Sequence, residues 1–189
     1  AASDVYKRQR DDFMKRICES IIFSALIFFS ACSMGGNVMD RDRKIANERM
    51  ESLLEAIQDK DRNTLQGMFS KTAITQAKNF ESQVMRLFDY YQGEVLSYDD
   101  WGGPGVSDEI ENGDRKKSMD LSCDVVTNVR EYRFLFLDIT VDDYNPDNVG
   151  IWSLYVIKKE DDTDPQMGYG GDGKYTPGIN IGIKNIYVD

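Results

Sequence analysis

The sequence predicts an α+β fold, in which N-terminal helices pack on a curved antiparallel sheet of four to five strands. Before Gly93, apolar residues recur at spacings of three and four, which is typical of amphipathic helices. After Gly93 the period changes to two, which is typical of strands with one buried face. A chain of 189 residues with 41% apolar content suits one globular domain, which we expect over residues 41–189.

The first thirteen residues look foreign to this domain. Residues 1–13 show no apolar run and no periodicity, and the chain does not begin with methionine. The string "AASDVYKRQ" resembles a translated sequencing adapter of the kind fused to gene ends in assembled metagenomic data. We therefore treat 1–13 as a non-native leader and expect the natural start at Met14.

Residues 14–31 have the features of a secretory signal peptide. Lys15 and Arg16 form a basic start, and a mostly apolar stretch follows over residues 17–29. A helix of this length rises only about 20 Å, which is short of the roughly 30 Å hydrocarbon core of a bilayer. Cleavage is therefore favoured over a permanent membrane span.

Cys32 follows this stretch and is the predicted site of lipid attachment. The preceding residues "FFSA" resemble the lipobox of bacterial lipoproteins, with Phe29 where leucine is usual. Residues 32–40 then read as a tether. The resemblance implies a protein on the outer face of the cytoplasmic membrane. An ordinary signal peptide, with Cys32 incidental, and an uncleaved anchor helix are the alternatives.

Three helices are expected in the first half of the domain. A long amphipathic helix runs over residues 38–61 and is broken by "DKDRN" at 59–63. A short helix follows around Leu65. A third helical region, "SKTAITQA" and then "NFESQVMRLFDYYQG", ends at Gly93.

Five candidate strands follow the helices. The expected ranges are 94–98, 118–129, 132–141, 151–158 and, less clearly, 179–188. The third candidate is apolar on both faces and should lie centrally, with Phe134, Phe136 and Asp138 on one side. Cys123 falls in the apolar row of the second candidate and is expected to be an inert, small hydrophobic residue.

Two family resemblances add to this interpretation. The run "LLEAIQDKDRNTLQGMFSKTA" is similar to the opening of the nuclear transport factor 2-like (cystatin-like) fold, a cone in which a sheet wraps around a long helix. The segments "YYQGEVLSYDDWGGPG", "DDYNPDNVGIWSLYVIKKEDD" and "GDGKYTPGINIG" resemble a family of uncharacterised lipoproteins from Gram-positive gut bacteria, a domain of unknown function with the same fold. The resemblance implies location and fold, and it brings no catalytic residues.

Composition argues against several classes of function. Acidic residues outnumber basic ones by 33 to 23, so the surface should repel nucleic acid, and no nucleic-acid partner is expected. The chain contains no histidine, which removes the commonest general base and the commonest transition-metal ligand. That absence weakens most enzyme hypotheses.

Asp138 is the candidate catalytic residue. It lies within an apolar strand, where burial can raise the pKa of a carboxyl group and suit it to act as a general base. The alternative is a structural acid that reaches solvent or pairs with Arg133, Arg130 or a lysine on a neighbouring strand.

Aromatic residues are the candidate lining of a ligand pocket at the open end of the cone. Most buried aromatic side chains are simply core, which is the competing interpretation. The candidates are Trp101, Trp152, Tyr155, Tyr169 and Tyr175.

No metal or cofactor is expected. Asp143, Asn145 and Asp147 alternate as in a calcium loop, but Asn148 and Leu154 stand where glycine and glutamate are needed, so a turn fits better. The glycine-rich run at 168–175 lacks the lysine followed by serine or threonine of a phosphate-binding loop.

These observations lead to three functional hypotheses. The first is a lipid-anchored domain, more plausibly not an enzyme, that binds a small ligand or a protein partner at the open end of the cone. The second is an isomerase- or hydrolase-type enzyme that uses Asp138 as base. The third is a structural or oligomerising module, which predicts a large apolar patch on the outer sheet face. The sequence does not fix the oligomeric state.

Overall fold

A computed structural model of the chain describes residues 38–161 and 174–182. The chain divides into two units, Ala1–Asn37 and Val38–Asp189, and all described residues belong to the second. The predicted leader 1–13, the signal peptide 14–31 and Cys32 lie outside the described residues. Helix α2 begins at Val38, within the last residues of the predicted tether, 32–40.

Within the described residues four helices precede the sheet, where three were expected. They are α2 (Val38–Gln58), α3 (Arg62–Gly67), α4 (Lys71–Gln76) and α5 (Phe80–Tyr90). Asp61 and Ser70 cap α3 and α4 through their side chains. Asn79 caps α5 with a left-handed backbone, φ 58°, and this break separates α4 from α5. None of the described helices is long and apolar enough to cross a membrane.

The described strands form one open, mixed sheet. They are β1 (Val95–Asp99), β2 (Gly105–Glu111), β3 (Asp114–Thr127), β4 (Glu131–Asp142), β5 (Gly150–Lys158) and β6 (Gly178–Ile181). The order is β1-β3-β4-β5-β6, and β2 pairs with β3 beside β1. The α+β class is therefore confirmed.

Two features of the sheet differ from the expectation. The described sheet has six strands, where four to five were expected. The strand that was not predicted is β2. All seven of its residues are exposed, so it lacks the alternating apolar pattern of a strand. The sheet is also not purely antiparallel, because β6 pairs parallel to β5. The far end of the predicted strand 179–188 lies outside the described residues.

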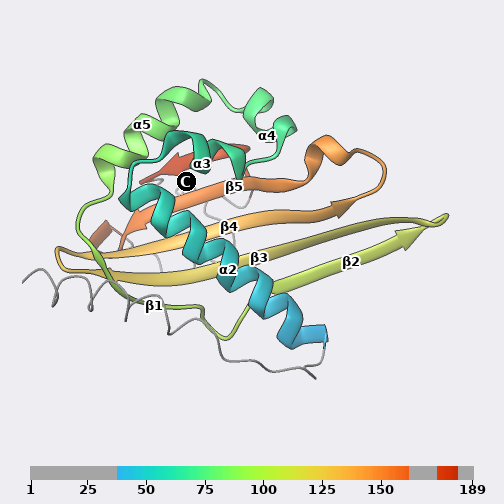
Figure 1. Cartoon of the computed structure of the whole chain (residues 1–189), viewed down its shortest axis with the longest axis horizontal. Coiled ribbons are helices and arrows are strands. Elements are labelled where there is room, and N and C mark those ends of the chain that lie inside the picture. The colour runs from blue at the N-terminus through green and yellow to red at the C-terminus, as the bar shows by residue number, and fades with distance from the viewer. Residues whose placement is uncertain (1–37, 162–173, 183–189) are drawn as a thin grey trace, which may run out of the picture. The chain divides into compact units, whose positions relative to one another are not determined.

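The helices cover one face of the sheet, which we call the inner face (Figure 1). Tyr132, Phe134 and Phe136 of β4 point into this core, as the sequence predicted for the two phenylalanines. They pack with apolar side chains of α2 and α5, among them Leu53 and Leu87, which have no exposed surface. Burial of these side chains is the main source of stability where the helices pack on the inner face.

A short connection between α3 and α4 links the helices to the first residues of β5. Between α3 and α4, Phe69 forms a parallel bridge with Ile151, and Ser70 N–H donates to the Ile151 carbonyl at 3.0 Å. Gly150, with φ 123°, permits this approach, since a Cβ there would lie 2.8 Å from Ser70 N. The close backbone contact therefore requires glycine at this position.

Candidate functional site

Asp138 lies on the inner face of β4 and is fully buried. Its Oδ2 accepts a hydrogen bond from Arg49 Nε of α2 at 2.9 Å. Its Oδ1 is buried and has no hydrogen-bond partner. Burial raises the pKa of Asp138, and the attraction of Arg49 only partly opposes this effect.

This geometry excludes two of the surroundings that the sequence suggested for Asp138, namely contact with solvent and pairing with a cation on a strand. The acid does not reach solvent, and the cation that pairs with it is Arg49, from a helix. The expectation that Arg133, Arg130 or a strand lysine would pair with it was therefore wrong. Arg133 lies on the opposite, outer face, where it donates to Asp124 at 3.1 Å. A catalytic role for Asp138 stays a prediction.

Three ion pairs fasten α2 to the sheet, and Arg49–Asp138 is the first of them. In the second, Lys117 Nζ of β3 lies 2.6 Å from Asp42 Oδ1, and both side chains are at most 10% exposed. In the third, Arg43 donates twice to Asp100, at 2.9 Å from both Nε and Nη2. The ion pairs of Asp42 and Arg43 thus lie in the first turns of α2 and that of Arg49 at its middle, whereas apolar packing dominates from Met50 onward.

A groove of about 430 Å³ opens beside this ion-paired half of α2. One wall is the first turns of α2, and the other is the β1–β2 connection together with β2. The lining residues are Val38, Met39, Asp40, Asp42, Arg43, Gly102, Gly103, Pro104, Val106 and Asp108. Its volume lies within the range of small-molecule sites.

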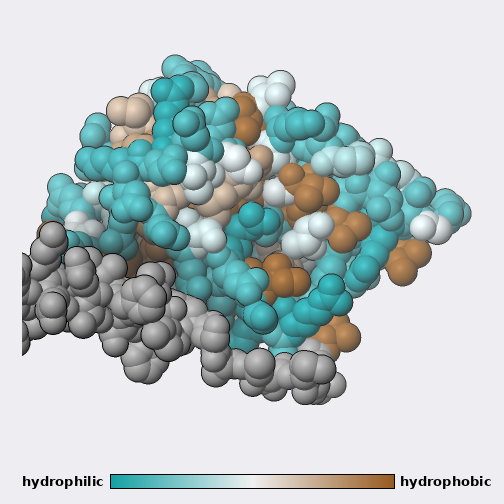
Figure 2. Space-filling view, in the orientation of Figure 1, coloured by the Kyte–Doolittle hydropathy of each residue, from teal (hydrophilic) through white to brown (hydrophobic). Residues whose placement is uncertain are grey.

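The groove combines exposed apolar side chains with charged ones, of which Asp42, Arg43 and Asp108 are ion-paired. Val38, Met39 and Val106 are exposed by 71%, 82% and 46%, although each is apolar. Figure 2 shows apolar side chains scattered over an otherwise hydrophilic surface toward the β2–β3 end of this face. Such a mixture of apolar and charged groups suits recognition.

Two carboxylates here are poor proton acceptors: Asp108, which lines the groove, and Asp100, which pairs with the lining residue Arg43. Burial raises the pKa of Asp100, but its hydrogen bonds with Arg43 and the Gly102 N–H outweigh burial, so the pKa is lowered overall. The hydrogen bond from Arg115 lowers the pKa of Asp108. Both acids are therefore ionised and paired at neutral pH, a state that favours binding over general base chemistry.

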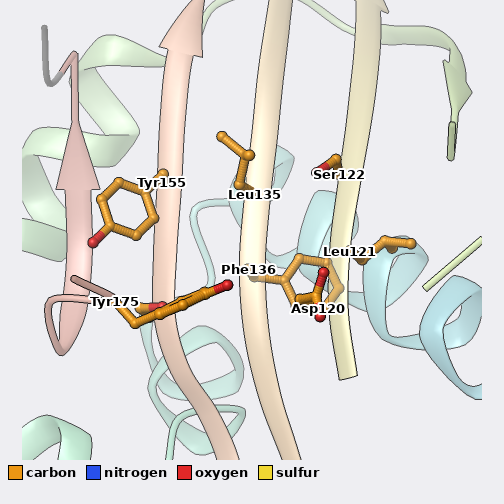
Figure 3. A pocket seen from close by; sticks show the side chains of 8 residues that line it. Asp120, Leu121, Ser122, Leu135, Phe136, Tyr155 and Tyr175 are labelled. Atoms are coloured by element: carbon orange, nitrogen blue, oxygen red, sulfur yellow. The ribbon is translucent and has the colours of Figure 1, made fainter. Parts of the chain in front are cut away.

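Two of the predicted pocket aromatics, Tyr155 and Tyr175, lie on the outer face of the sheet (Figure 3), and a third, Trp152 of β5, is hydrogen-bonded to Tyr175. Trp152 Nε1 donates to the Tyr175 carbonyl at 2.9 Å, and Tyr155 Oη accepts from Thr176 N–H at 2.7 Å. Tyr155 and Tyr175 line a cavity of about 10 Å³, which is room for about one water. Ser153 Oγ also borders this cavity and is buried without a hydrogen-bond partner.

Trp101 does not join this cluster. Trp101 is 45% exposed and stacks on the guanidinium of Arg133, with Cζ 4.3 Å from the ring centroid. Tyr169 lies outside the described residues. The pocket-lining role of the five aromatics stays a prediction.

The turn after β4 uses its polar residues internally. Asp142 accepts from Asn145 N–H and from Asn148 Nδ2, and a short 3₁₀ helix (Pro146–Asn148) completes the turn. Asp147 instead pairs with Lys71 at 2.8 Å. The predicted turn is confirmed, and within residues 38–161 and 174–182 no group of three or more acids or cysteines is placed to hold a metal.

Sequence reasoning missed the groove because its two walls lie about 60 positions apart in the chain. One sequence feature pointed to this region. The run "DDWGGPG" places two acids and a tryptophan before a Gly-Gly-Pro turn, and this turn connects β1 to β2, which both pair with β3. The exposed start of α2, Val38 and Met39, was the other signal, because apolar residues there have no core to enter.

Comparison with known proteins places the chain in a family. No curated protein matches it. The family described as a domain of unknown function (DUF5104) matches residues 52–159, a range that runs from α2 to the end of β5 and includes Arg49's partner Asp138 but not Arg49 itself. The match covers more than half of the chain, and the chain belongs to this family of uncharacterised domains.

Proposed function

We propose that this chain is a lipid-anchored, extracytoplasmic binding module, and that its ligand or partner docks in the groove between α2 and β2. The groove is the observation that carries the proposal. It is open and of ligand size, and it is lined by apolar side chains beside paired charges. It belongs to the open end of the nuclear transport factor 2-like cone that we propose for this family.

The anchor rests on the sequence. The basic start, the short apolar stretch and "FFSA" before Cys32 support a lipoprotein signal. Attachment at Cys32 would hold the groove near the outer face of the cytoplasmic membrane, because Val38, which borders the groove, follows Cys32 closely in the chain.

Metabolic labelling tests the anchor. A palmitate analogue should tag the wild-type chain and should fail to tag Cys32→Ser. Cys18→Ser is the matched control, because it removes a cysteine from the apolar stretch and should keep the tag. Labelling that persists in Cys32→Ser would refute attachment at this residue.

Binding to the groove is tested with hexylamine, whose apolar tail and cationic head match Val106 and Asp40. In amide NMR spectra of the full chain in detergent micelles, resonances of Gly102, Gly103 and Val106 should shift on titration. Val106→Arg should abolish the shifts, whereas Val129→Arg, at an exposed position outside the groove, should not. Unchanged resonances in the wild type, with hexylamine and with short peptides, would contradict the proposal.

Catalysis by Asp138 is the second candidate. The observations that favour it are the raised pKa of Asp138 and its Oδ1 without a partner. Asp138 does not line the groove, and no Trp or Tyr hydroxyl or indole group hydrogen-bonds to it in the described structure. A substrate that turns over with wild type but not with folded Asp138→Asn would establish this role.

A further inference from the structure

β2 is an edge strand with one unpaired side. It pairs with β3 over all seven of its residues, and within the described part of the chain no strand lies on its other side. All seven residues are exposed. An exposed sheet edge of this length can accept an added strand.

The hairpin turn determines which backbone groups of β2 face outward. Asn112 and Gly113, both with positive φ, form the two-residue turn that joins Glu111 to Asp114. Residues flanking such a turn form a hydrogen-bonded pair, and the pattern then alternates along the strands. The N–H and C=O groups of Val106, Asp108 and Ile110 are therefore on the free edge.

The register of β3 toward β4 agrees with this assignment. The Arg115 carbonyl accepts from Asp143 N–H, and the Lys117 carbonyl accepts from Thr140 Oγ1, so both carbonyls point away from β2. Arg115 and Lys117 are the partners of Ile110 and Asp108 in the ladder. Those pairs are consequently the non-hydrogen-bonded ones.

The charge of the edge selects the occupant. From Asp99 to Glu111 the chain carries five acids and no base. Asp100 and Asp108 are paired with Arg43 and Arg115, but no basic side chain of the described residues pairs with Glu109 or Glu111. Lys116, opposite Glu109 on β3, forms no ion pair with an acid of the described residues.

A second copy of the chain fits this edge poorly. Antiparallel pairing of β2 with another β2 would set acids opposite or diagonal to acids across the new ladder, which is unfavourable. A strand with lysine or arginine would instead meet unpaired carboxylates. Apolar residues at alternate positions would meet Val106 and Ile110, which lie on the groove side of the strand with Asp108.

We propose that the partner is an extended basic peptide segment that adds as a strand to β2 and places alternate side chains over the groove beside α2. This inference rests on the proposed function, since it names the class of partner for the same groove. Strand addition requires main-chain hydrogen bonds to Val106, Asp108 and Ile110. A ligand that only fills the groove would not form these bonds.

The test uses the full-length chain in detergent micelles and a nine-residue peptide that alternates lysine and valine. Residue-resolved hydrogen exchange should show new protection, of at least tenfold, at the amides of Val106, Asp108 and Ile110. The same peptide with N-methyl groups at alternate residues should lose this protection, because it cannot complete the ladder. A peptide with glutamate in place of lysine should bind at least tenfold more weakly.

Protein variants separate backbone from side-chain effects. Ile110→Pro removes one outward N–H and should weaken peptide binding about tenfold, whereas Ile110→Ala keeps that N–H and should weaken it less than threefold. Glu109→Lys with Glu111→Lys, at two exposed positions, should weaken binding most at low salt.

The outcomes separate this inference from the proposed function. Equal binding of the N-methylated peptide, or Ile110→Pro and Ile110→Ala behaving alike while both remain folded, would overturn strand addition. If hexylamine still shifts Gly102, Gly103 and Val106 in that case, the groove remains a binding site. If neither probe affects these residues, both proposals fail.

Discussion

The two ends of α2 are held to the same sheet by different physics. At the C-terminal end, Leu53, Leu54 and Ile57 enter a core of aromatic and aliphatic side chains. From the N-terminal end to the middle, α2 is attached by the pairs of Asp42, Arg43 and Arg49 with Lys117, Asp100 and Asp138. Apolar packing closes one end of the inner face, and the ion-paired end leaves room for a groove.

Because its two ends are held in different ways, α2 gives this domain both a stable core and an open surface. Apolar burial is roughly proportional to area and tolerates little empty space. Ion pairs act at a few points, and both partners must be present, because a buried charge without its partner destabilises the fold. Substitutions at the two ends should therefore fail in different ways.

The largest expected effect is at the apolar end. Phe134→Ala should lower the free energy of unfolding by about 4 kcal/mol, because it removes a fully buried ring from the core. Urea denaturation measures this loss, with Val129→Ala, at an exposed position, as the control. A loss below about 1 kcal/mol would show that the core relaxes into the space.

Arg49→Met should have the next largest effect, about 2 kcal/mol at pH 7, because it leaves Asp138 buried without its cation. This loss is smaller than the roughly 3–5 kcal/mol typical of a broken buried pair, since the Arg49 side chain is 31% exposed. The double variant Arg49→Met with Asp138→Leu should recover most of the loss. Recovery would assign a structural role to the pair, and no recovery would contradict it.

The loss in Arg49→Met should also depend on pH. Burial raises the pKa of Asp138, so its ionisation weakens the fold as the pH rises from the ordinary carboxyl range through that raised pKa. Arg49 matters only when Asp138 is charged. The difference between wild type and Arg49→Met should therefore shrink as the pH falls below the pKa of the buried acid, and a pH-independent difference would exclude this mechanism.

A smaller effect is expected on the outer face. Trp101→Ala removes a ring that stacks on Arg133 but is partly exposed, so the free energy of unfolding should fall by no more than about 1 kcal/mol. Arg133 keeps its ion pair with Asp124 in this variant. A larger loss in urea would mean that Trp101 organises the β1–β2 connection.

No reaction is expected at Cys123 in the folded chain. Burial raises the pKa of its thiol to about 12, so almost no thiolate exists at pH 8. Iodoacetamide treatment followed by mass spectrometry should find the Cys123 peptide unmodified in buffer and alkylated in urea. Modification under native conditions would show that the inner face opens near β3.

The sequence predicts those parts of this fold whose burial is periodic. β3, β4 and β5 alternate or are apolar throughout, and α2 and α5 carry regular apolar stripes, so their existence and type could be inferred. β2 was missed because an exposed, acidic edge strand has no such period. Its place is set by the Asn112–Gly113 turn and by pairing with β3, and these depend on tertiary structure.

The candidate site was harder to predict for a related reason. Asp138 was recognised as unusual from its apolar neighbours, but its partner is 89 positions away, and several cations on nearby strands were equally compatible with the pattern. The groove depends on how far the start of α2 stands from β2. That distance is determined by tertiary packing, which no local sequence pattern predicts.

The attachment of α2 by ion pairs has a mechanical consequence. A pulling force on the chain ahead of Val38 enters the domain through the first turns of α2 and loads the Asp42–Lys117 and Arg43–Asp100 pairs first. The Arg43–Asp100 pair, whose arginine side chain is 51% exposed, weakens with ionic strength, whereas the Asp42–Lys117 pair, in which both side chains are buried, is screened much less. Resistance of this end to tension should therefore respond to salt in two stages, with the outer pair yielding before the buried one.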